Sequence, residues 1–317
     1  MRERRCAAST RAGGERPDTV RAMRVATHNG SFHADDVFAI AVLRLLHGDE
    51  LEVVRTRDPE LLAAADLRVD VGLRSDPASG DFDHHQRGGA GERPNGIRYA
   101  SFGLVWKAFG PEICGSDEIA ADIDALVVQG IDANDVGQTI VEPLVGAIAP
   151  LTVSHAIGMM NPNWDQDTSG AAKDAAFMEA VAFAQGILAR AVASGQAQAR
   201  AAELVRSAIA RAEDPRLIEL ERGMPWHREL VANAPEALFV VYPREQDWGL
   251  QAVPKALGEF ANRKDLPASW AGMTDAELAA VTGVPDARFC HAGRFMAVAD
   301  SRDGALALAR RALADGT

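Results

Sequence analysis

The 317-residue chain is expected to be an α/β protein: an N-terminal parallel sheet with helices on both faces, a helical connector and a smaller α/β C-terminal domain. Three observations predict this class. Apolar runs alternate with helical segments over short connections in the first third, which indicates parallel strands. A long Ala-rich stretch follows, and strand-like runs then return. The composition, 47% hydrophobic and 25% charged, is that of a globular protein with a large core.

The N-terminal elements follow from local patterns. The residues from Val37 to His47 are apolar nearly all round and predict a covered helix, capped by Asp35 or Asp36. The other expected elements are strands at 23–27, 51–56 and 67–71, helices at 59–65, 101–109 and 117–129, and an acidic turn at 130–137. Parallel strands joined by such short crossovers form an open sheet.

The rest of the chain divides at its long Ala-rich segment. We place a DHH-like catalytic domain at 23–167, a helical connector at 168–214 that is broken at Ser194–Gly195 and ended by Pro215, and a substrate-binding domain at 215–317. In that last domain, strands are expected at 217–220, 237–242, 248–253, 288–291 and 295–299, with helices at 274–281 and 301–314. Residues 1–22 are Arg-rich without apolar periodicity, which indicates a disordered tail or a mis-called start before Met23.

Composition also limits the function classes. A net charge of -12 argues against a protein that coats nucleic acid by general electrostatics, although carboxylates gathered around metal ions would contribute to it. Three cysteines form no disulfide framework, so we expect a reducing compartment and a cytoplasmic location. The apolar runs are shorter than a bilayer-spanning helix needs, so no membrane partner is expected.

Two short segments concentrate side chains that bind metals. His28, His33, Asp35 and Asp36 follow the first strand, and Asp83-His84-His85 lies about fifty residues later. Ligands that converge at the ends of strands predict a metal site. The alternative reading makes the first acids helix caps and the second run a solvated turn.

Further carboxylates complete the predicted site. Asp70 ends the third strand, and Asp132 or Asp135 is available in the acidic turn. Mixed His and Asp ligands suit Mn²⁺, Mg²⁺ or Zn²⁺, with Mn²⁺ favoured when carboxylates dominate. Two such ions would lower the pKa of a shared water and neutralise phosphate oxygens, so a phosphoester is the substrate that most needs them.

Several motifs are shared with a known family. They are the stretches at 27–36, 82–86, 99–106, 131–137, 161–164 and 289–295, which run in order over most of the chain. With these motifs the chain resembles the melanocyte proliferating gene one family of DHH-like metal-dependent hydrolases, in the DHH phosphoesterase superfamily whose Asp-His-His signature would be Asp83, His84 and His85. The resemblance implies a catalytic N-terminal domain, a C-terminal substrate domain with the site in the cleft between them, and 3′→5′ exonuclease activity on RNA.

The resemblance also implies roles for single residues. Asp70 matches the aspartate of the second motif and His84 the ligand of the third, while His85 would contact the phosphate or a residue outside the set of metal ligands. The first motif departs from the superfamily spacing, so the places of His33, Asp35 and Asp36 stay open, as does the choice between Asp132 and Asp135. In the C-terminal domain, the implied substrate-binding residues are His291, Gly293 and Arg294.

The sequence therefore predicts a metal-dependent phosphodiesterase, a 3′–5′ exonuclease on RNA or short oligonucleotides. Two Mn²⁺ ions would be held by His28, His33, Asp35, Asp36, Asp70, His84 and one of Asp132 or Asp135, with Asp83, His84 and His85 as the catalytic residues. The first alternative is a phosphohydrolase of pyrophosphate or a nucleotide at the same site, and the second is a metal-binding protein without hydrolase activity. RNA is the expected partner, and a homodimer is left open.

Overall fold

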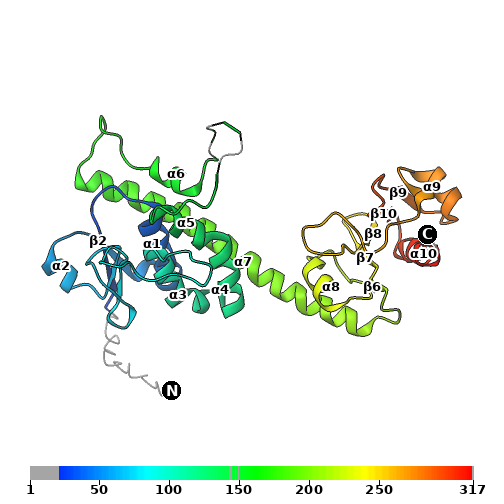
Figure 1. The fold of residues 1–317 in the computed structure, drawn as a ribbon, viewed down its shortest axis with the longest axis horizontal. Helices are drawn as coiled ribbons and strands as arrows, with labels where there is room; N and C mark the ends of the chain where they lie inside the picture. The colour runs from blue at the N-terminus through cyan, green and yellow to red at the C-terminus, as the bar shows by residue number, and fades with distance from the viewer. Residues whose placement is uncertain (1–20, 143–144, 147, 149, 316–317) are drawn as a thin grey trace, which may run out of the picture. The chain divides into compact units, whose positions relative to one another are not determined.

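The chain divides into two compact units. The structure, a computed structural model, describes residues 21–142, 145–146, 148 and 150–315 (Figure 1). Unit 1 ends at Val192, and unit 2 runs from Ala193 to Thr317. The predicted N-terminal tail at 1–22 lies almost entirely outside the described residues.

Unit 1 contains a five-stranded sheet in the order β2-β1-β3-β5-β4. Its strands are β1 (Met23–Thr27), β2 (Leu51–Arg55), β3 (Leu67–Val69), β4 (Ser75–Asp76) and β5 (Asp81–Phe82). All neighbouring pairs are parallel except the β4–β5 pair. The carboxyl ends of the parallel strands therefore share one edge, and the predicted α/β class is confirmed.

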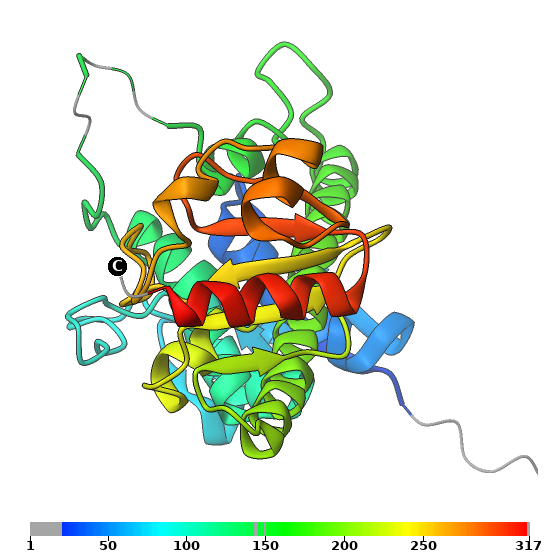
Figure 2. The same cartoon turned by 90° about the vertical axis from the view of Figure 1, so that its right-hand side faces the viewer.

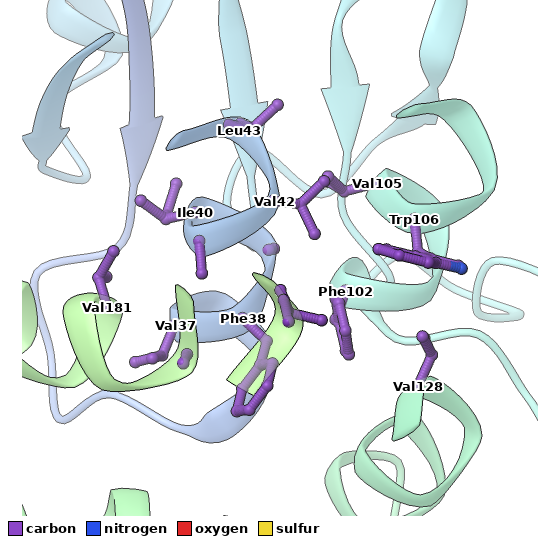
Figure 3. Close-up of a cluster of buried hydrophobic side chains, with 14 of the residues drawn as sticks. Val37, Phe38, Ile40, Val42, Leu43, Phe102, Val105, Trp106, Val128 and Val181 are labelled. Atoms are coloured by element: carbon purple, nitrogen blue, oxygen red, sulfur yellow. The ribbon is translucent and has the colours of Figure 1, made fainter. Parts of the chain in front are cut away.

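Helices complete unit 1. They are α1 (Ala34–His47), α2 (Pro59–Ala63), α3 (Ser101–Cys114), α4 (Asp117–Ile123), the π-helix η3 (Asp124–Val128), α5 (Gln129–Asp135) and α6 (Val153–Gly158), with 3₁₀ turns η1 (Gly48–Glu50) and η2 (Pro77–Ser79). The long helix α7 (Gly170–Arg211) begins in unit 1 and continues into unit 2 after Val192. Helix α1 packs against α3, and the rings of Phe38 and Phe102 lie 5.3 Å apart between them (Figure 3). Because α1 is apolar on nearly every face, its burial in this core fixes the loop that precedes it.

Several expected boundaries differ from the structure. Helix α1 begins three residues earlier than predicted, because Asp36 accepts the backbone N–H of His33 and so caps the helix from within its first turn. The expected acidic turn is helix α5, which buries Ile131 and Ala133. Helix α7 continues through Ser194–Gly195, because the cost of one glycine, about 1 kcal/mol, is small in an Ala-rich helix. The third strand ends at Val69 rather than Val71.

Unit 2 is a second five-stranded sheet in the order β6-β7-β8-β10-β9. Its elements are β6 (Leu217–Glu219), α8 (His227–Asn233), β7 (Phe239–Pro243), β8 (Trp248–Ala252), η4 (Ala268–Trp270), α9 (Asp275–Thr282), β9 (Ala287–Cys290), β10 (Met296–Ala299) and α10 (Arg302–Ala314). Strands β7 and β8 form the predicted hairpin. Helix α10 lies across the sheet and buries Leu308 and Ala309 against it (Figure 2).

One described helix, α7, is long and apolar enough to cross a bilayer by length and composition alone, contrary to the reading of the sequence. This is weak evidence, because the core helix of a folded domain meets the same criterion. In unit 1, α7 buries Phe177, Val181 and Leu188 in the hydrophobic core.

Candidate metal centre

The loop after β1 brings His28 against two buried carboxylates. His28 Nε2 lies 3.1 Å from Asp36 Oδ2 and 3.3 Å from Asp70 Oδ2. His28 and Asp70 follow the neighbouring parallel strands β1 and β3, whereas Asp36 comes from the first turn of α1. The shared carboxyl edge of the sheet therefore assembles the first group of donor atoms.

The other oxygen of Asp70 faces a second group. Asp70 Oδ1 lies 3.3 Å from His84 Nε2 and 3.3 Å from His85 Nδ1, and it accepts the hydroxyl of Ser101 at 3.2 Å. The backbone of Asp70 is left-handed, with φ 55°, and its N–H donates to Phe82 O at 3.1 Å. This turn lets one carboxylate present one oxygen to each side of the site.

His84 extends the site toward α5. Its Nε2 lies 3.1 Å from Asp135 Oδ2 and 3.9 Å from Asp35 Oδ2. Three sets of donor atoms can each surround one cation, because the atoms of each set lie within 4.8 Å of one another: His28, Asp36 and Asp70; Asp35, His84 and Asp135; and Asp70, His84 and His85. Asp70 and His84 each belong to two sets, so the three sets form one continuous centre.

Helix α3 anchors two of the buried acids. Asp35 Oδ1 accepts the N–H of Phe102 at 2.7 Å, and its Oδ2 accepts that of Ser101 at 3.1 Å. Asp132 Oδ1 accepts the next N–H, that of Gly103, at 3.0 Å. These amides have no partner inside the helix, and the helix dipole favours negative charge there. The first turn of α3 therefore holds Asp35 in place opposite His84.

The crowding of charges shifts the pKa values of the site. Burial alone would lower the pKa of both histidines, but neighbouring carboxylates raise it, to about 9 for His28 beside Asp36 and Asp70 and to about 10 for His84 beside Asp135 and Asp70. Burial raises the pKa of Asp35, and its carboxylate neighbours raise it further. Burial opposes the ionisation of Asp70 as well, yet the three histidines that surround it lower its pKa.

The residues present fit a divalent cation. Asp36 Oδ2 and His84 Nε2 are buried, and although each lies 3.1 Å from an oppositely charged group, neither makes a well-formed hydrogen bond among the described residues. Such atoms are costly unless a ligand satisfies them. The donors are imidazole nitrogens and carboxylate oxygens without a thiolate, a set that suits Mn²⁺, Mg²⁺ or Zn²⁺.

Three predicted residues, His33, Asp83 and Asp132, lie beside the centre rather than in its donor sets. His33 is 64% exposed, and its Nδ1 is 3.8 Å from Asp135 Oδ1. Asp83 accepts the backbone N–H groups of Leu73 and His85, and its Oδ1 lies 2.9 Å from His85 Nδ1. It therefore orients His85.

Asp132 has a separate role from Asp135. Its Oδ2 lies 2.8 Å from Arg93 Nη1, and Arg93 also donates to Asp124. A Cβ built on Gly103 would lie 1.9 Å from Asp132 Oδ2, so the helix and the carboxylate are in close contact. Of the two acids between which the sequence leaves the choice open, Asp135 is the one that faces His84.

The predicted substrate-binding residues lie in unit 2. His291, Gly293 and Arg294 form the turn between β9 and β10, where Gly293 N donates to His291 Nδ1 at 2.9 Å. Arg294 has a left-handed backbone, with φ 58°, and its Nη2 donates to Asp265 Oδ2 at 2.9 Å. The structure thus places these residues outside the donor sets of unit 1.

Three residues that contact the site were given no role by the sequence: Ser101, Arg55 and Asn161. Ser101 binds Asp70, and Arg55 and Asn161 contact the loop that carries His28. Asn161 stands in one of the shared motifs, whereas Arg55 reads as the end of an ordinary strand.

An apolar cavity of about 650 Å³, lined by Phe38 and Ile131 among others, contains none of the metal-centre residues.

Comparison with known families agrees with this picture. The model of the MYG1 exonuclease family, described as an uncharacterised protein family (UPF0160), matches residues 24–313. The chain belongs to the MYG1 family. The human MYG1 exonuclease is 34% identical over 327 residues, which cover 92% of this chain and 86% of that protein.

The family likeness extends to distant relatives. The MYG1 protein of Saccharomyces cerevisiae is 32% identical over 92% of this MYG1 family member and 96% of its own length. The MYG1 protein of Chlamydia trachomatis is 30% identical over 88% of this chain and 92% of its own. A crystal structure of the exonuclease RecJ bound to manganese is 16% identical, with a TM-score of 0.25, and covers 92% of this chain and 90% of that one. Membership of the family rests on the sequence matches.

Proposed function

We propose that this MYG1 family member is a metal-dependent phosphodiesterase that removes nucleotides from the 3′ end of RNA or short oligonucleotides. The observation that carries the proposal is the position of Asp70, with one oxygen 3.3 Å from His28 and the other 3.3 Å from His84. A carboxylate shared in this way is suited to hold two divalent cations side by side. Phosphodiester hydrolysis is the reaction that most benefits from such a pair.

The donor atoms of the centre would hold two Mn²⁺ ions. His28 and Asp36 would bind the first, Asp135 and His84 would bind the second with Asp35 nearby, and Asp70 would contact both. When bound, such ions lower the pKa of water and neutralise the charge on a phosphate. The protein places these donors in a buried setting, where electrostatic interactions are strong.

His85 is the residue placed to contact the substrate. Its side chain is 53% exposed, whereas its Nδ1 is held between Asp70 and Asp83. The Asp70 carboxylate raises the pKa of His85, which favours the charged form of the ring. With Nδ1 fixed, His85 can donate from its other nitrogen to a phosphate oxygen and stabilise the developing negative charge.

The names of the relatives favour a nuclease over a phosphohydrolase of small molecules. Mammalian members of the family are named MYG1 exonucleases. The test is to incubate the purified full chain and Mn²⁺ with a short RNA labelled at its 5′ end. We expect a ladder that shortens one nucleotide at a time from the 3′ end, and no shortening with the Asp70→Asn variant. Intact RNA with wild-type protein that has bound Mn²⁺ would overturn the proposal.

A second candidate is a phosphohydrolase of pyrophosphate or a nucleotide. The net charge of -12 favours this reading, because a small anion meets less long-range repulsion than a polymer does. Rates on pyrophosphate, a dinucleotide and the short RNA under the same conditions distinguish the two. Faster turnover of pyrophosphate than of either nucleic acid would select the second candidate.

A further inference from the structure

The loop between β1 and α1 carries His28, but little regular structure supports it. Its residues 28–33 have no helix or strand assignment. Within the loop, Gly30 N donates to His28 Nδ1 at 3.3 Å, so the backbone N–H of Gly30 contacts the imidazole nitrogen that does not face Asp36 and Asp70. A contact that fixes the backbone of Gly30 therefore limits the movement of His28.

Arg55 fixes the backbone of Gly30 through its carbonyl oxygen. It is the last residue of β2, and its Nη2 donates to Gly30 O at 2.6 Å. Its guanidinium carbon lies 4.6 Å from the centre of the Phe177 ring and 5.8 Å from that of Phe32, and Nη1 lies 3.0 Å from Asp174 Oδ1. The side chain is 3% exposed. A charge buried this deeply is retained only when its partners satisfy it, and here one partner is the metal-binding loop.

Asn161 holds the other half of the loop. Phe32 N donates to Asn161 Oδ1 at 3.0 Å, and Asn161 Nδ2 donates to Phe32 O at 2.9 Å. One side-chain amide thus pairs with both backbone groups of Phe32, as a neighbouring strand would. Phe32 is fully buried with its ring 5.6 Å from that of Phe177, so the Asn161 and Arg55 contacts meet at the same aromatic pair.

We propose that Arg55 and Asn161 are positioning residues for the metal centre, which hold the loop so that His28 Nε2 stays opposite Asp36 and Asp70. The proposal rests on the metal centre of the proposed function and not on its substrate. Neither residue belongs to a donor set, and both act through the backbone of the loop. Residues that orient a ligand from outside the coordination sphere commonly change metal affinity by about 10–100-fold.

The position of these contacts predicts which ion is affected. Arg55 and Asn161 contact the loop on the side of His28, whereas Asp135 and His84 are held by α5 and by the turn after β5. Loss of either contact should therefore weaken binding of the ion held by His28, Asp36 and Asp70 and leave binding of the other ion unchanged. A general loss of stability would weaken the binding of both ions to a similar extent.

The test is titration of the metal-free full chain with Mn²⁺ by calorimetry. Arg55→Gln and Asn161→Ala are expected to weaken one of two binding steps by about 10–100-fold. The same step should be missing in His28→Ala, and adding Arg55→Gln to His28→Ala should cause no further loss, because both changes act on one ligand. Arg55→Lys, which keeps the charge but offers no planar fork, should fall between Arg55→Gln and wild type.

Arg263→Gln is the matched control. Arg263 is a partly buried arginine of unit 2 that donates to the carbonyls of Ala234 and Ala237, so its removal costs stability without touching the loop. The proposal is overturned if folded Arg55→Gln and Asn161→Ala bind both ions as wild type does, or if Arg263→Gln weakens the same step equally. Wild-type protein that binds Mn²⁺ without cleaving RNA would sink the proposed function and leave this inference intact.

Discussion

At the scale of single residues, Asp70 is the centre of the site. It is the only residue whose two side-chain oxygens face different donor sets among the described residues. Asp70→Asn keeps the shape but replaces one oxygen with a donor, so we expect both ions to bind more than about 100-fold more weakly. Calorimetric titration with Mn²⁺ measures this. The exposed Asp76→Asn is the control, and equal affinities for the two variants would contradict the prediction.

Substitutions of the two acids of α5 should have different effects on metal binding and on stability. Asp135→Asn removes a neighbour of His84 and should abolish binding of one Mn²⁺ ion with little change in melting temperature of the metal-free protein. Asp132→Asn leaves Arg93 without one of its buried partners and should cost about 3 kcal/mol of stability, with Mn²⁺ affinity retained. Calorimetry of both variants, with and without Mn²⁺, decides between the roles. The reverse pattern would assign the ligand to Asp132.

Metal binding should depend steeply on pH. In the metal-free protein the pKa values of His28 and His84 are raised to about 9 and about 10, above the usual 6.5. Their ion pairs therefore stabilise the metal-free fold fully below pH 6.5, and this contribution is lost as the pH rises through 9–10. Mn²⁺ needs both rings neutral, so its apparent affinity should increase from pH 6 to pH 9 with release of one to two protons. Titrations in buffers of different ionisation enthalpy count those protons, and a flat profile would contradict this.

At the scale of elements, α7 supports the loop that carries His28 through Phe177 and, by way of Arg55, through Asp174. Phe177 is fully buried and contacts both Phe32 and Arg55. Phe177→Ala should cost about 3–5 kcal/mol of stability. Phe183→Ala, on the same helix but 46% exposed, should cost less than about 1 kcal/mol. Chemical denaturation measures both, and similar losses would show that the packing of Phe177 is not what stabilises this region.

Sequence patterns predicted the elements better than their ends. The apolar face of α1 and the hairpin of β7 and β8 are strong periodic signals, and the structure confirms both. The strand β5 was not predicted, because two residues are too few to show alternation. Helix α5 was read as a turn because Gly130, Asp132 and Asp135 are turn residues, whereas its burial against α1 and α3 decides its conformation.

At the scale of the whole molecule, the candidate metal centre concentrates acidic side chains inside an acidic protein. Asp35, Asp36 and Asp70 are all buried in a chain of net charge -12. A cation that binds only the folded state should stabilise it by about 2.7 kcal/mol at a concentration of 100 Kd. We expect Mn²⁺ to raise the melting temperature and a chelator to lower it. No shift with Mn²⁺, in a protein shown to be folded, would contradict a divalent-cation site.

The sequence predicts the donor residues of the site but not the contacts that position them. Histidines and aspartates at strand ends can be recognised by residue type, so His28, Asp70 and His84 can be named from the sequence. That Asp70 faces both sides depends on a left-handed backbone, and the separation of Asp132 from Asp135 depends on Arg93. Both features arise from contacts between segments distant in the sequence, which no local pattern records.

The closeness of Gly103 to Asp132 has a consequence for genetic variation. Position 103 lies in the first turn of α3, where even a methyl group would overlap the buried carboxylate. That turn also carries the amides that bind Asp35, so a bulkier residue would move the start of α3 away from Asp35. Missense alleles at this codon should therefore behave as null alleles, although glycine has no side chain that could bind a metal or react.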